Sequence, residues 1–400
     1  MVCKAYSVGC KTNQYEAEAL KEALAKLDGD FVVLNTCAVT AEAEHKSLKM
    51  LRSILRGHPS ATVVVTGCLA TYKPHRFMHP RVVTVPNEQK KNIPELFGAY
   101  PVQYISSFSE HSRAFIKVAD GCPHRCSYCI VSKLRGVLHS RPIDDILKEA
   151  EILSKNGYKE IVLTAINLAS YGRDIGSSLV TLLKAIDSSG LFPRIRLSSL
   201  EPHFIDERLL EGLSECVHLC PHFHIPLQAG SDEILKAMNR PYIVQDFLAI
   251  TEKLKKIFDR PALSTDIIIG FPGETEADFL CTLRIAEEVG FCRIHIFPFS
   301  AREGTEAWNL PNGVSHKVIR KRAELLKNLA NRLAEIYRRS LIGIQETVVV
   351  EEVHKDGVIG LIERYQKVKI EGSVAKRGEC LSAQIYDVHP SSQILLANLQ

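Results

Sequence analysis

The chain has 400 residues, of which 46% are hydrophobic and 24% charged, and its formal net charge is +4. This is the composition of a folded protein with two or three domains. No apolar run approaches the roughly 20 residues that span a bilayer, which excludes a membrane-spanning helix. The first residues lack the layout of a signal peptide, so we expect a cytoplasmic protein. Twelve cysteines in that reducing compartment indicate metal ligands or catalytic groups, not disulfides.

The first 100 residues alternate predicted strands and helices. A continuous apolar run such as Phe31-Val-Val-Leu is typical of a strand buried on both faces. Asn13 and Glu16 have the spacing of a capping box, which predicts the start of the first helix. We expect strands over residues 4–8, 31–34, 62–66 and 81–85 and helices over 13–27 and 41–56. These elements predict an α/β domain with a parallel sheet.

Three cysteines of this domain share one position. Cys10, Cys37 and Cys68 each follow closely after a predicted strand. The carboxyl ends of parallel strands meet at one edge of a sheet, where open α/β sheets bind ligands. We therefore favour a cluster of three thiolates over the alternative of three small core residues.

A loop over residues 99–113 is predicted to end this domain, and a longer alternating series follows. The expected strands cover 114–118, 160–164, 194–198, 222–226, 262–269 and 292–298, with helices between them, for example at 143–155. Six strands with helical crossovers predict a parallel sheet curled into a partial barrel, with its helices outside. Chemistry in such folds takes place at the carboxyl ends of the strands.

Cys122, Cys126 and Cys129 directly follow the first of these strands, with the spacing Cys-x3-Cys-x2-Cys. A cubic iron–sulfur cluster takes four ligands, so three thiolates leave one iron open to bind and activate another molecule. Zinc sites usually pair two Cys-x2-Cys motifs, and no second pair lies nearby. A thioredoxin-like redox pair would need Cys126 and Cys129 in a different topology. We therefore predict that the three cysteines hold an iron–sulfur cluster.

The chain changes character near residue 317. Residues 317–339 have helical apolar spacing and eight basic against two acidic side chains, which predicts a basic amphipathic helix. Its basic side is either a nucleic-acid contact or an ordinary solvated face. Short strands at 345–353, 357–364, 366–370 and 381–388 predict a small all-β domain, a type that often binds RNA. This segment has six basic and eight acidic residues, so RNA binding would have to come from local basic patches or from the basic helix.

Several other side chains are weaker candidates. An alternating run could line a zinc site, but a proline interrupts it and core packing is favoured; the run is Cys216, His218, Cys220, His222 and His224. Asp266 adjoins an apolar stretch, so it is either buried and paired or part of an N-terminal turn. Arg141 and Arg240 are expected by default in surface ion pairs, with carboxylate or phosphate binding as the alternative.

The motif of Cys122, Cys126 and Cys129, with Tyr128 before the third cysteine, resembles that of the radical S-adenosylmethionine (SAM) enzymes. The resemblance implies that the open iron holds the amino and carboxylate groups of SAM and that Tyr128 lies near its adenine. An electron from the reduced cluster would then split SAM and give a 5′-deoxyadenosyl radical. The protein has to position and shield that radical.

Other segments resemble the methylthiotransferases of that superfamily. They are Gly9-Cys-Lys-Thr-Asn-Gln-Tyr-Glu, Asn35-Thr-Cys-Ala-Val-Thr, Thr66-Gly-Cys, Arg196-Leu-Ser-Ser-Leu-Glu-Pro, His224-Ile-Pro-Leu-Gln, Met238-Asn-Arg, Thr265-Asp-Ile-Ile-Ile-Gly-Phe-Pro-Gly-Glu and Phe299-Ser-Ala-Arg-Glu-Gly-Thr. The C-terminal segment resembles the TRAM RNA-binding module, so the resemblance covers essentially the whole chain. The first two motifs are closest to the branch acting on N6-threonylcarbamoyladenosine in tRNA. The family's usual Gly, Gly and Ser are replaced by Ala165, Ala169 and Ala229, small changes that bear on fine geometry.

The resemblance implies domains, a reaction and a site. The expected domains are an auxiliary-cluster domain over 1–105, a radical SAM barrel over 108–335 and a TRAM-like domain over 338–400. The expected reaction is methylthiolation of C2 of N6-threonylcarbamoyladenosine at position 37 of tRNA, with one SAM as methyl donor and another as radical source. Two 4Fe-4S clusters are implied, one on Cys10, Cys37 and Cys68 and one on Cys122, Cys126 and Cys129. The implied cofactor-binding residues are Tyr128, Glu201, His224, Gln228 and Asp266, although for Glu201 a plain surface carboxylate is an equal alternative.

The implied partners are the tRNA anticodon loop, an external electron donor and an unidentified sulfur source, without a membrane. The adenosine has to leave its stack to react, which is easier in a single-stranded loop. Two alternatives keep the chemistry and change the substrate, to a prenylated adenosine of tRNA or to an aspartate of a ribosomal protein. An alternative of another class is a non-catalytic iron–sulfur or zinc regulator that binds RNA.

Overall fold

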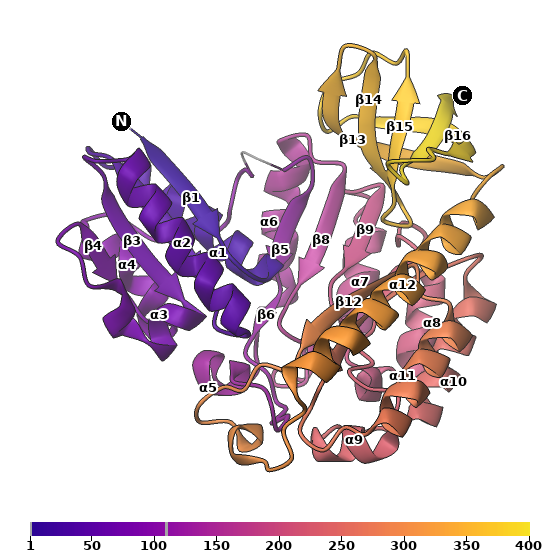
Figure 1. Ribbon diagram of the computed structural model, residues 1–400. Helices are drawn as coiled ribbons and strands as arrows, with labels where there is room; N and C mark the ends of the chain where they lie inside the picture. Colours follow the sequence, from indigo (N-terminus) through magenta and orange to yellow (C-terminus); the bar gives the residue numbers. More distant parts are fainter. Residues whose placement is uncertain (1, 109–110) are drawn as a thin grey trace.

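The computed structural model describes residues 2–108 and 111–400. Three bodies follow one another along the chain: an N-terminal α/β domain, a curled parallel sheet with helices outside, and a small C-terminal β-barrel (Figure 1). The fold class predicted from the sequence is confirmed. The loop expected over 99–113 includes residues 109 and 110, which lie outside the described residues.

The N-terminal sheet has four parallel strands in the order β1-β2-β3-β4. β2 is buried at every position because helices pack on both faces of the sheet. Ser7 pairs with Asn35 and Thr36 with Gly67, so β1, β2 and β3 end at the same edge. The strands are β1 (Cys3–Ser7), β2 (Phe31–Thr36), β3 (Thr62–Gly67) and β4 (Val82–Thr84), and the helices are α1 (Lys11–Leu24), α2 (Ala41–Gly57), α3 (Cys68–Tyr72) and α4 (Ile93–Leu96).

The first helix does not begin where the capping box predicts. α1 starts at Lys11, so Asn13 and Glu16 lie inside the helix. The Asn13 side-chain amide instead donates to the carbonyl oxygens of Val8 and Thr36, at 2.7 and 3.1 Å. A buried asparagine therefore ties the helix to two strand ends. Sequence spacing could not distinguish this tertiary role from a local cap, because the same residue type serves both.

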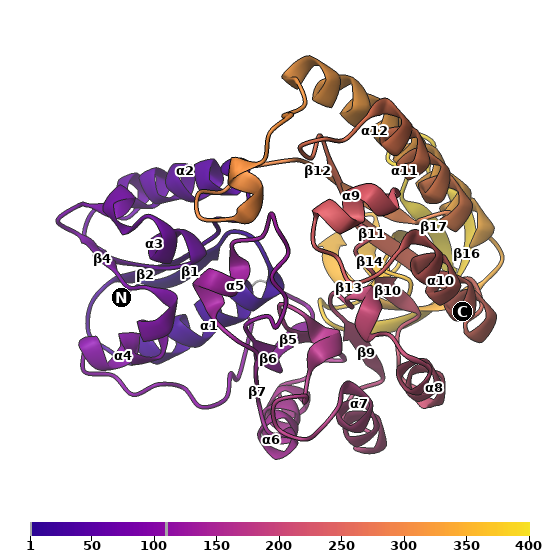
Figure 2. The same ribbon diagram turned by 90° about the horizontal axis from the view of Figure 1, so that it is seen from below.

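The middle sheet has six parallel strands in chain order. β5, β8 and β9 form one half and β10, β11 and β12 the other, and bridges from Ile195 to Leu219 and from Ser199 to His224 join the halves. The helices lie along the outer side of the curled sheet (Figure 2). The strands are β5 (Ala114–Lys117), β8 (Glu160–Thr164), β9 (Arg194–Leu197), β10 (His222–His224), β11 (Ala262–Ile269) and β12 (Arg293–Pro298). The main helices are α6 (Ile143–Lys155), α7 (Leu179–Ser188), α8 (Glu207–Glu215), α10 (Val244–Ile257) and α11 (Glu276–Val289), with a short α9 (Asp232–Ala237).

One small feature of the middle domain was not expected from the sequence. Two-residue strands β6 (Ala119–Asp120) and β7 (His139–Ser140) pair antiparallel and enclose the segment that contains α5 (Val131–Arg135). Strands this short have no periodic sequence pattern, so only the folded chain reveals them.

The C-terminal domain is a closed barrel with strand order β13-β14-β15-β17-β16. Its strands are β13 (Gln345–His354), β14 (Gly357–Ile362), β15 (Lys367–Glu371), β16 (Cys380–Val388) and β17 (Leu395–Leu399). The sequence predicts the first four strands; β17 was not expected, and it closes the barrel between β15 and β16. The basic helix α12 (His316–Ser340) leads into this domain. Within the described residues, we find no helix with both the length and the apolar character that crossing a membrane requires.

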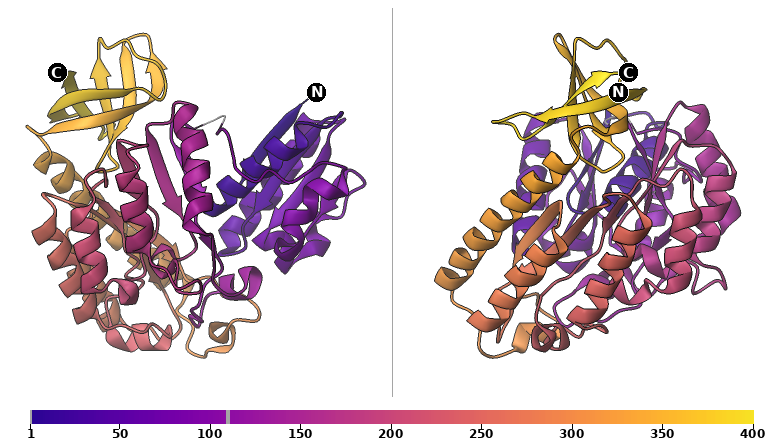
Figure 3. Two further views of the ribbon diagram at one scale, coloured as in Figure 1. Left: turned by 180° about the vertical axis from the view of Figure 1, so that it is seen from behind. Right: turned by 90° about the vertical axis from the view of Figure 1, so that its right-hand side faces the viewer.

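The C-terminal barrel covers the amino-terminal ends of β8 and β9 (Figure 3). Glu160, at the start of β8, is wholly buried and pairs at 2.7 Å with each of Arg194 and Arg196. Arg194 also donates to the carbonyl oxygens of Thr347 and Leu361 in the C-terminal barrel. The carboxyl ends of the strands stay on the opposite side, free for a site.

Candidate active site

Cys122, Cys126 and Cys129 lie between β6 and α5, beyond the carboxyl end of β5. The loop starts at Gly121, whose φ is +73° and where a Cβ would lie 1.9 Å from the Val137 carbonyl oxygen. Only glycine fits there. The amide of Cys129 donates to the carbonyl of Cys126 at 3.0 Å, which closes the turn. The backbone therefore presents the three thiols from one tight loop.

These three thiols lie close enough to influence one another. Burial raises the pKa of Cys122 to about 11 and that of Cys129 to about 12, and the Cys126 thiol contributes to both shifts. Burial also raises the pKa of Cys126, although Arg240 opposes the shift by donating from Nη1 to Cys126 Sγ at 3.1 Å. Bound metal displaces thiol protons and offsets the cost of burying thiolates. The donor set therefore fits the three-thiolate ligation of a cubic cluster.

Arg240 and Glu201 form a buried ion pair beside this loop. Their side chains are 2% and 15% exposed, and Arg240 Nη2 donates to Glu201 Oε2. The surface ion pair expected for Arg240 is therefore wrong, because the turn after α9 brings it against Cys126. The same default is wrong for Arg141, which pairs at 2.6 Å with the wholly buried Glu149.

Gln228, four residues after His224 in the chain, has a strained backbone that pairs with β11. Its φ is +64°, and its amide and carbonyl bond to the carbonyl of Asp266 and the amide of Ile268, both at 2.9 Å. A residue other than glycine in the left-handed region costs energy, and such residues concentrate at functional sites. Tyr128 is half-buried, and burial raises its pKa well above the usual value, so its hydroxyl stays protonated.

His224, Asp266 and His295 come together on the inner face of the sheet, on β10, β11 and β12. Their ligand atoms all lie within 4.8 Å of one another, and His224 Nε2 is 3.3 Å from Asp266 Oδ2. Asp266 lies inside β11, half-buried and paired, and not in a turn. The sequence did not single out His295. Of the alternating run Cys216 to His224, only His224 joins a potential metal-binding group in the described part of the chain.

Cys10, Cys37 and Cys68 converge at the carboxyl edge of the N-terminal sheet. A Cβ on Gly9 would lie 2.8 Å from Cys37 Sγ, which places the residue before Cys10 directly against the second cysteine. Burial, together with the neighbouring thiols of Cys68 and Cys10, raises the pKa of Cys37 to about 12. Three thiols from three strand ends thus form a second group with the donor chemistry of an iron–sulfur site.

A buried charge network connects the two cysteine groups. Arg135, at the end of α5, pairs with Glu16 of α1 at 3.0 Å and with Asp120 at 2.8 Å. Lys90 and Lys117 also bind Glu16, at 2.5 and 2.9 Å. These cations hold the pKa of Glu16 well below its usual value although burial alone would raise it. The network joins the N-terminal domain to the loop that carries the other cysteines.

Sequence reasoning missed Arg135, Lys117 and His295. Only their positions in the chain gave a signal. Arg135 lies six residues after Cys129, and His295 lies on a strand whose neighbouring strands carry candidate residues. Neither signal identifies a partner. Ion pairs such as Glu16 with Arg135 join residues 119 positions apart in the sequence, and only folding brings them together.

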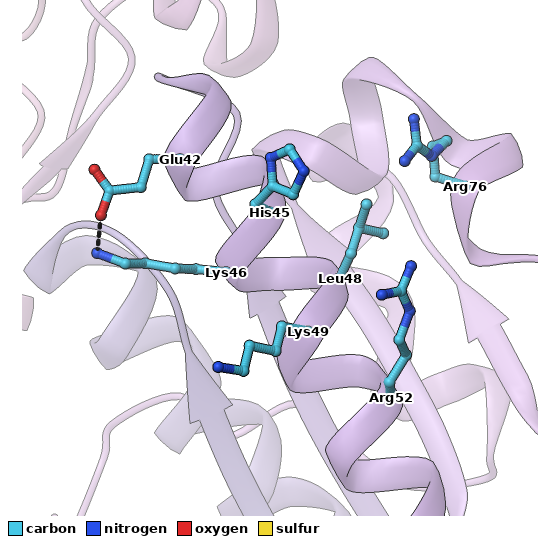
Figure 4. A pocket seen from close by; sticks show the side chains of 7 residues that line it. All are labelled: Glu42, His45, Lys46, Leu48, Lys49, Arg52 and Arg76. Atoms are coloured by element: carbon cyan, nitrogen blue, oxygen red, sulfur yellow. Dashed lines mark ion pairs between the residues drawn. The ribbon is translucent and has the colours of Figure 1, made fainter. Parts of the chain in front are cut away.

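A basic groove lies along one side of α2 (Figure 4). Its volume is about 330 Å³, and its lining residues are Glu42, His45, Lys46, Leu48, Lys49, Arg52 and Arg76. Glu42, the one carboxylate, pairs with Lys46 at 2.6 Å. Lys49 and Arg52 form no ion pair within the described residues, so the groove presents uncompensated positive charge.

Comparisons with known proteins match both cysteine-bearing regions. Residues 116–286 match the model of the radical SAM superfamily, and residues 3–85 match that of the uncharacterized protein family UPF0004. The threonylcarbamoyladenosine tRNA methylthiotransferases MtaB of Thermotoga maritima and Chlamydia pneumoniae are 37% and 38% identical, covering 91% and 93% of this chain and 90% and 92% of theirs. The tRNA-2-methylthio-N(6)-dimethylallyladenosine synthase of Acetivibrio thermocellus is 32% identical over 87% of this chain and 80% of its own.

Among solved structures, the radical SAM methyltransferase TsrM of Kitasatospora setae aligns with a TM-score of 0.52 at 16% identity, over 70% of this chain and 64% of TsrM. At that identity the likeness bears on the fold alone. Fold and cysteine loop together define a radical SAM enzyme, for which one 4Fe-4S cluster and SAM are the cofactors. The sequence identities narrow the class: the chain belongs to the radical SAM methylthiotransferase family.

Proposed function

We propose that this protein methylthiolates C2 of N6-threonylcarbamoyladenosine at position 37 of tRNA. The observation that carries the proposal is the 37–38% identity to two relatives named for that nucleoside, across more than nine-tenths of the chain. Relatives named for either nucleoside also occur at 30–32% identity. The preference for the threonylcarbamoyl substrate therefore rests on the identities of 37% and 38%.

In the proposed site each cysteine group holds one 4Fe-4S cluster. The SAM-binding cluster is on Cys122, Cys126 and Cys129, and the auxiliary cluster, which takes part in sulfur delivery, is on Cys10, Cys37 and Cys68. Bound cluster and SAM supply one-electron chemistry at an aromatic C–H bond that acid–base groups cannot usefully deprotonate. An external electron donor and a sulfur source are required as partners.

The other side chains position the reactants. Arg240 donates to Cys126 Sγ and binds Glu201, so it fixes a ligand and a pocket carboxylate together. Glu201 and Tyr128 lie on the cluster side and are assigned to SAM. Gln228, with its fixed left-handed backbone, is assigned to the same cofactor. His224 and Asp266 line the inner face and complete the proposed pocket.

We propose that the anticodon loop of tRNA reaches the site, with the adenosine turned out of its stack. Phosphate contacts are assigned to the groove on α2 and to the start of α12. Arg322 of α12 is buried against Glu274 at 2.6 Å and is not available. Lys317, Arg320 and Lys321 stay exposed. The reaction is placed in the cytoplasm, and the domains are assigned to residues 1–105, 108–335 and 338–400.

Nucleoside analysis of tRNA tests the substrate. Purified protein reconstituted with iron and sulfide, and given SAM, a reductant and added sulfide as the sulfur source, should convert N6-threonylcarbamoyladenosine in tRNA to its 2-methylthio derivative. Mass spectrometry detects the product. Deletion of the gene should abolish that nucleoside in cells without a paralogue. Formation of the methylthio derivative of prenylated adenosine, or of a ribosomal-protein aspartate, would assign the alternative substrate. A protein with zinc alone and no iron would be the non-catalytic regulator.

A further inference from the structure

The inner face of β10, β11 and β12 carries a continuous row of polar side chains. Ser264 Oγ lies 3.2 Å from His222 Nε2 and 3.1 Å from His224 Nδ1. In the parallel register, Arg293 is opposite Ser264 and His295 is opposite Asp266. Residues in register on neighbouring strands point to the same face, so the list below shares one face with the site: His222, His224, Ser264, Asp266, Arg293 and His295.

The N-terminal and C-terminal domains each contribute a side chain at this row. The ring of Tyr365, between β14 and β15 of the C-terminal barrel, packs 4.7 Å from the ring of His222. Lys11, at the start of α1, places its Nζ 5.3 Å from the centre of the Tyr365 ring. Lys11 directly follows Cys10, whereas His224 and Asp266 belong to the pocket of the other cysteine group. The row therefore lies where all three domains meet.

Around this row of polar side chains, positive charge exceeds negative charge. Three arginines near the amino-terminal ends of the strands already have partners: Arg113, Arg194 and Arg196 share Glu160, and Arg113 also binds Glu351. Lys11 and Arg293 take part in no ion pair within residues 2–108 and 111–400. Asp266 is the remaining carboxylate of the row, and it lies beside His224 and His295.

The titration of neighbouring groups reflects the excess of positive charge. Burial lowers the pKa of His295 to about 4, and Arg293 and Lys11 contribute to the shift. Burial alone would raise the pKa of Tyr365, but Lys11 and Arg113 hold it at about 8. The histidine is therefore neutral near pH 7, and the positive charge without an acidic partner belongs to Lys11 and Arg293. Burial lowers the pKa of Lys11 below its usual value, although Tyr365 opposes that shift.

This charge is accessible. Lys11 and His295 are half-buried and Arg293 is exposed, although they lie inside the curve of the sheet. Positive charge that is neither paired nor sealed from solvent favours an anionic ligand. A lysine and an arginine from two domains give charge-assisted hydrogen bonds to a carboxylate.

We propose that Lys11 and Arg293 bind the carboxylate of the threonylcarbamoyl group on the substrate adenosine. The inference rests on the function proposed above and adds how the substrate is selected. A prenyl group has no carboxylate, so it would leave both cations without a partner, and a site built for a charged group rejects an analogue that lacks the charge.

Binding of two synthetic anticodon stem-loops tests the proposal. One carries N6-threonylcarbamoyladenosine, and the other carries the same nucleoside with its carboxylate replaced by a neutral carboxamide. The reconstituted protein should bind the carboxylate form about tenfold more tightly or better, as expected when a charge-assisted contact is lost. Fluorescence anisotropy measures the two dissociation constants without turnover.

Lys11→Met and Arg293→Met should each reduce the ratio of the two dissociation constants, carboxamide form over carboxylate form. The double variant should bring this ratio close to one. Lys26→Met and Arg284→Met, which remove exposed cations elsewhere, should leave it unchanged. Iron content verifies that Lys11→Met, next to Cys10, keeps its clusters; Arg293 is not adjacent to any proposed ligand and provides an independent variant.

Four results would overturn the inference. The unchanged protein could bind both stem-loops equally well and still methylthiolate the threonylcarbamoyl nucleoside. That result would refute the inference and leave the proposed function standing. A ratio that survives both substitutions would place carboxylate recognition elsewhere. A loss of SAM affinity in the variants that matches the loss of stem-loop affinity would assign the cations to the cofactor. Methylthiolation of prenylated adenosine alone would reject both the function and the inference.

Discussion

At the scale of single residues, Arg240 has the most direct link to the proposed chemistry. It donates to Cys126 Sγ at 3.1 Å and binds Glu201 with the other end of its guanidinium group. A planar group with fixed donors holds a thiol and a carboxylate in one geometry, which a lysine does not. Cys126 is therefore both a proposed ligand and the contact through which the pocket is aligned with the cluster.

Replacing Cys126 separates the two proposed clusters. Cys126→Ala removes one of three thiolates from the SAM-binding site, so we expect turnover to fall to background. Iron should fall from about eight to about four atoms per chain, since each cubic cluster holds four. Iron and sulfide analysis with a methylthiolation assay measures both. Cys281→Ala, at a half-buried cysteine outside both groups, is the matched control, and retained turnover in Cys126→Ala would reject the radical site.

At the scale of secondary-structure elements, β8 organises the junction between the middle sheet and the C-terminal barrel. Its first residue, Glu160, is fully buried among Arg113, Arg194 and Arg196. Arg196 in turn donates to the carbonyl oxygens of the C-terminal domain. One carboxylate thus pairs with three cations at a domain interface.

Glu160→Gln should destabilise the protein by about 3–5 kcal/mol, because it leaves buried cations without their counter-charge. Denaturant unfolding at pH 7 measures the change. Glu151→Gln, at an exposed carboxylate paired with Lys155, should have little effect. A Glu160→Gln variant as stable as the parent would show that the guanidinium groups find other partners.

The same carboxylate predicts a pH dependence. The arginines hold the folded-state pKa of Glu160 far below its usual value although burial opposes this. Its stabilising contribution is therefore present above the unfolded-state pKa of about 4.3 and declines as the pH falls below that value toward the folded-state pKa. The stability difference between parent and Glu160→Gln should be constant from pH 7 to 5 and shrink below about pH 4. A difference that grows on acidification would contradict the assignment.

At the scale of the whole molecule, the three domains meet at the polar row of β10, β11 and β12, and basic surfaces lie outside this meeting point. The groove lies on α2 of the N-terminal domain. The exposed Lys317 and Lys321 lie on α12, the helix that leads into the C-terminal barrel (Figure 1). The C-terminal barrel is not basic overall, so affinity for a phosphate backbone has to come from these other surfaces.

Lys49→Gln with Arg52→Gln should weaken tRNA binding and flatten its salt dependence. The slope of log K against log salt should drop by roughly one to two, in line with about one unit for each lost phosphate contact. Filter binding at several salt concentrations gives the slope. Lys256→Gln with Arg284→Gln, two exposed cations on α10 and α11, is the control. An unchanged slope in the groove variant would remove α2 from the tRNA interface.

Features that depend on near neighbours in the chain could be predicted from the sequence. The spacing of Cys122, Cys126 and Cys129 and the alternation of apolar runs with helical segments are local patterns, so they predict a cluster loop and a parallel α/β fold. The position of Cys10, Cys37 and Cys68 after strands predicts their convergence, because parallel strands end at one edge.

The contacts that connect these parts could not be predicted and are seen only in the folded chain. Asn13 and Glu16 have the spacing of a cap, yet Asn13 binds two strand ends and Glu16 binds Lys90, Lys117 and Arg135. Arg240 reads as a surface cation, yet it contacts a proposed ligand. Charged side chains carry no sequence mark of their partners, since an ion pair forms wherever folding brings opposite charges into a place with little water. The sequence therefore predicts which groups perform the chemistry, and the folded chain determines which charges hold them in position.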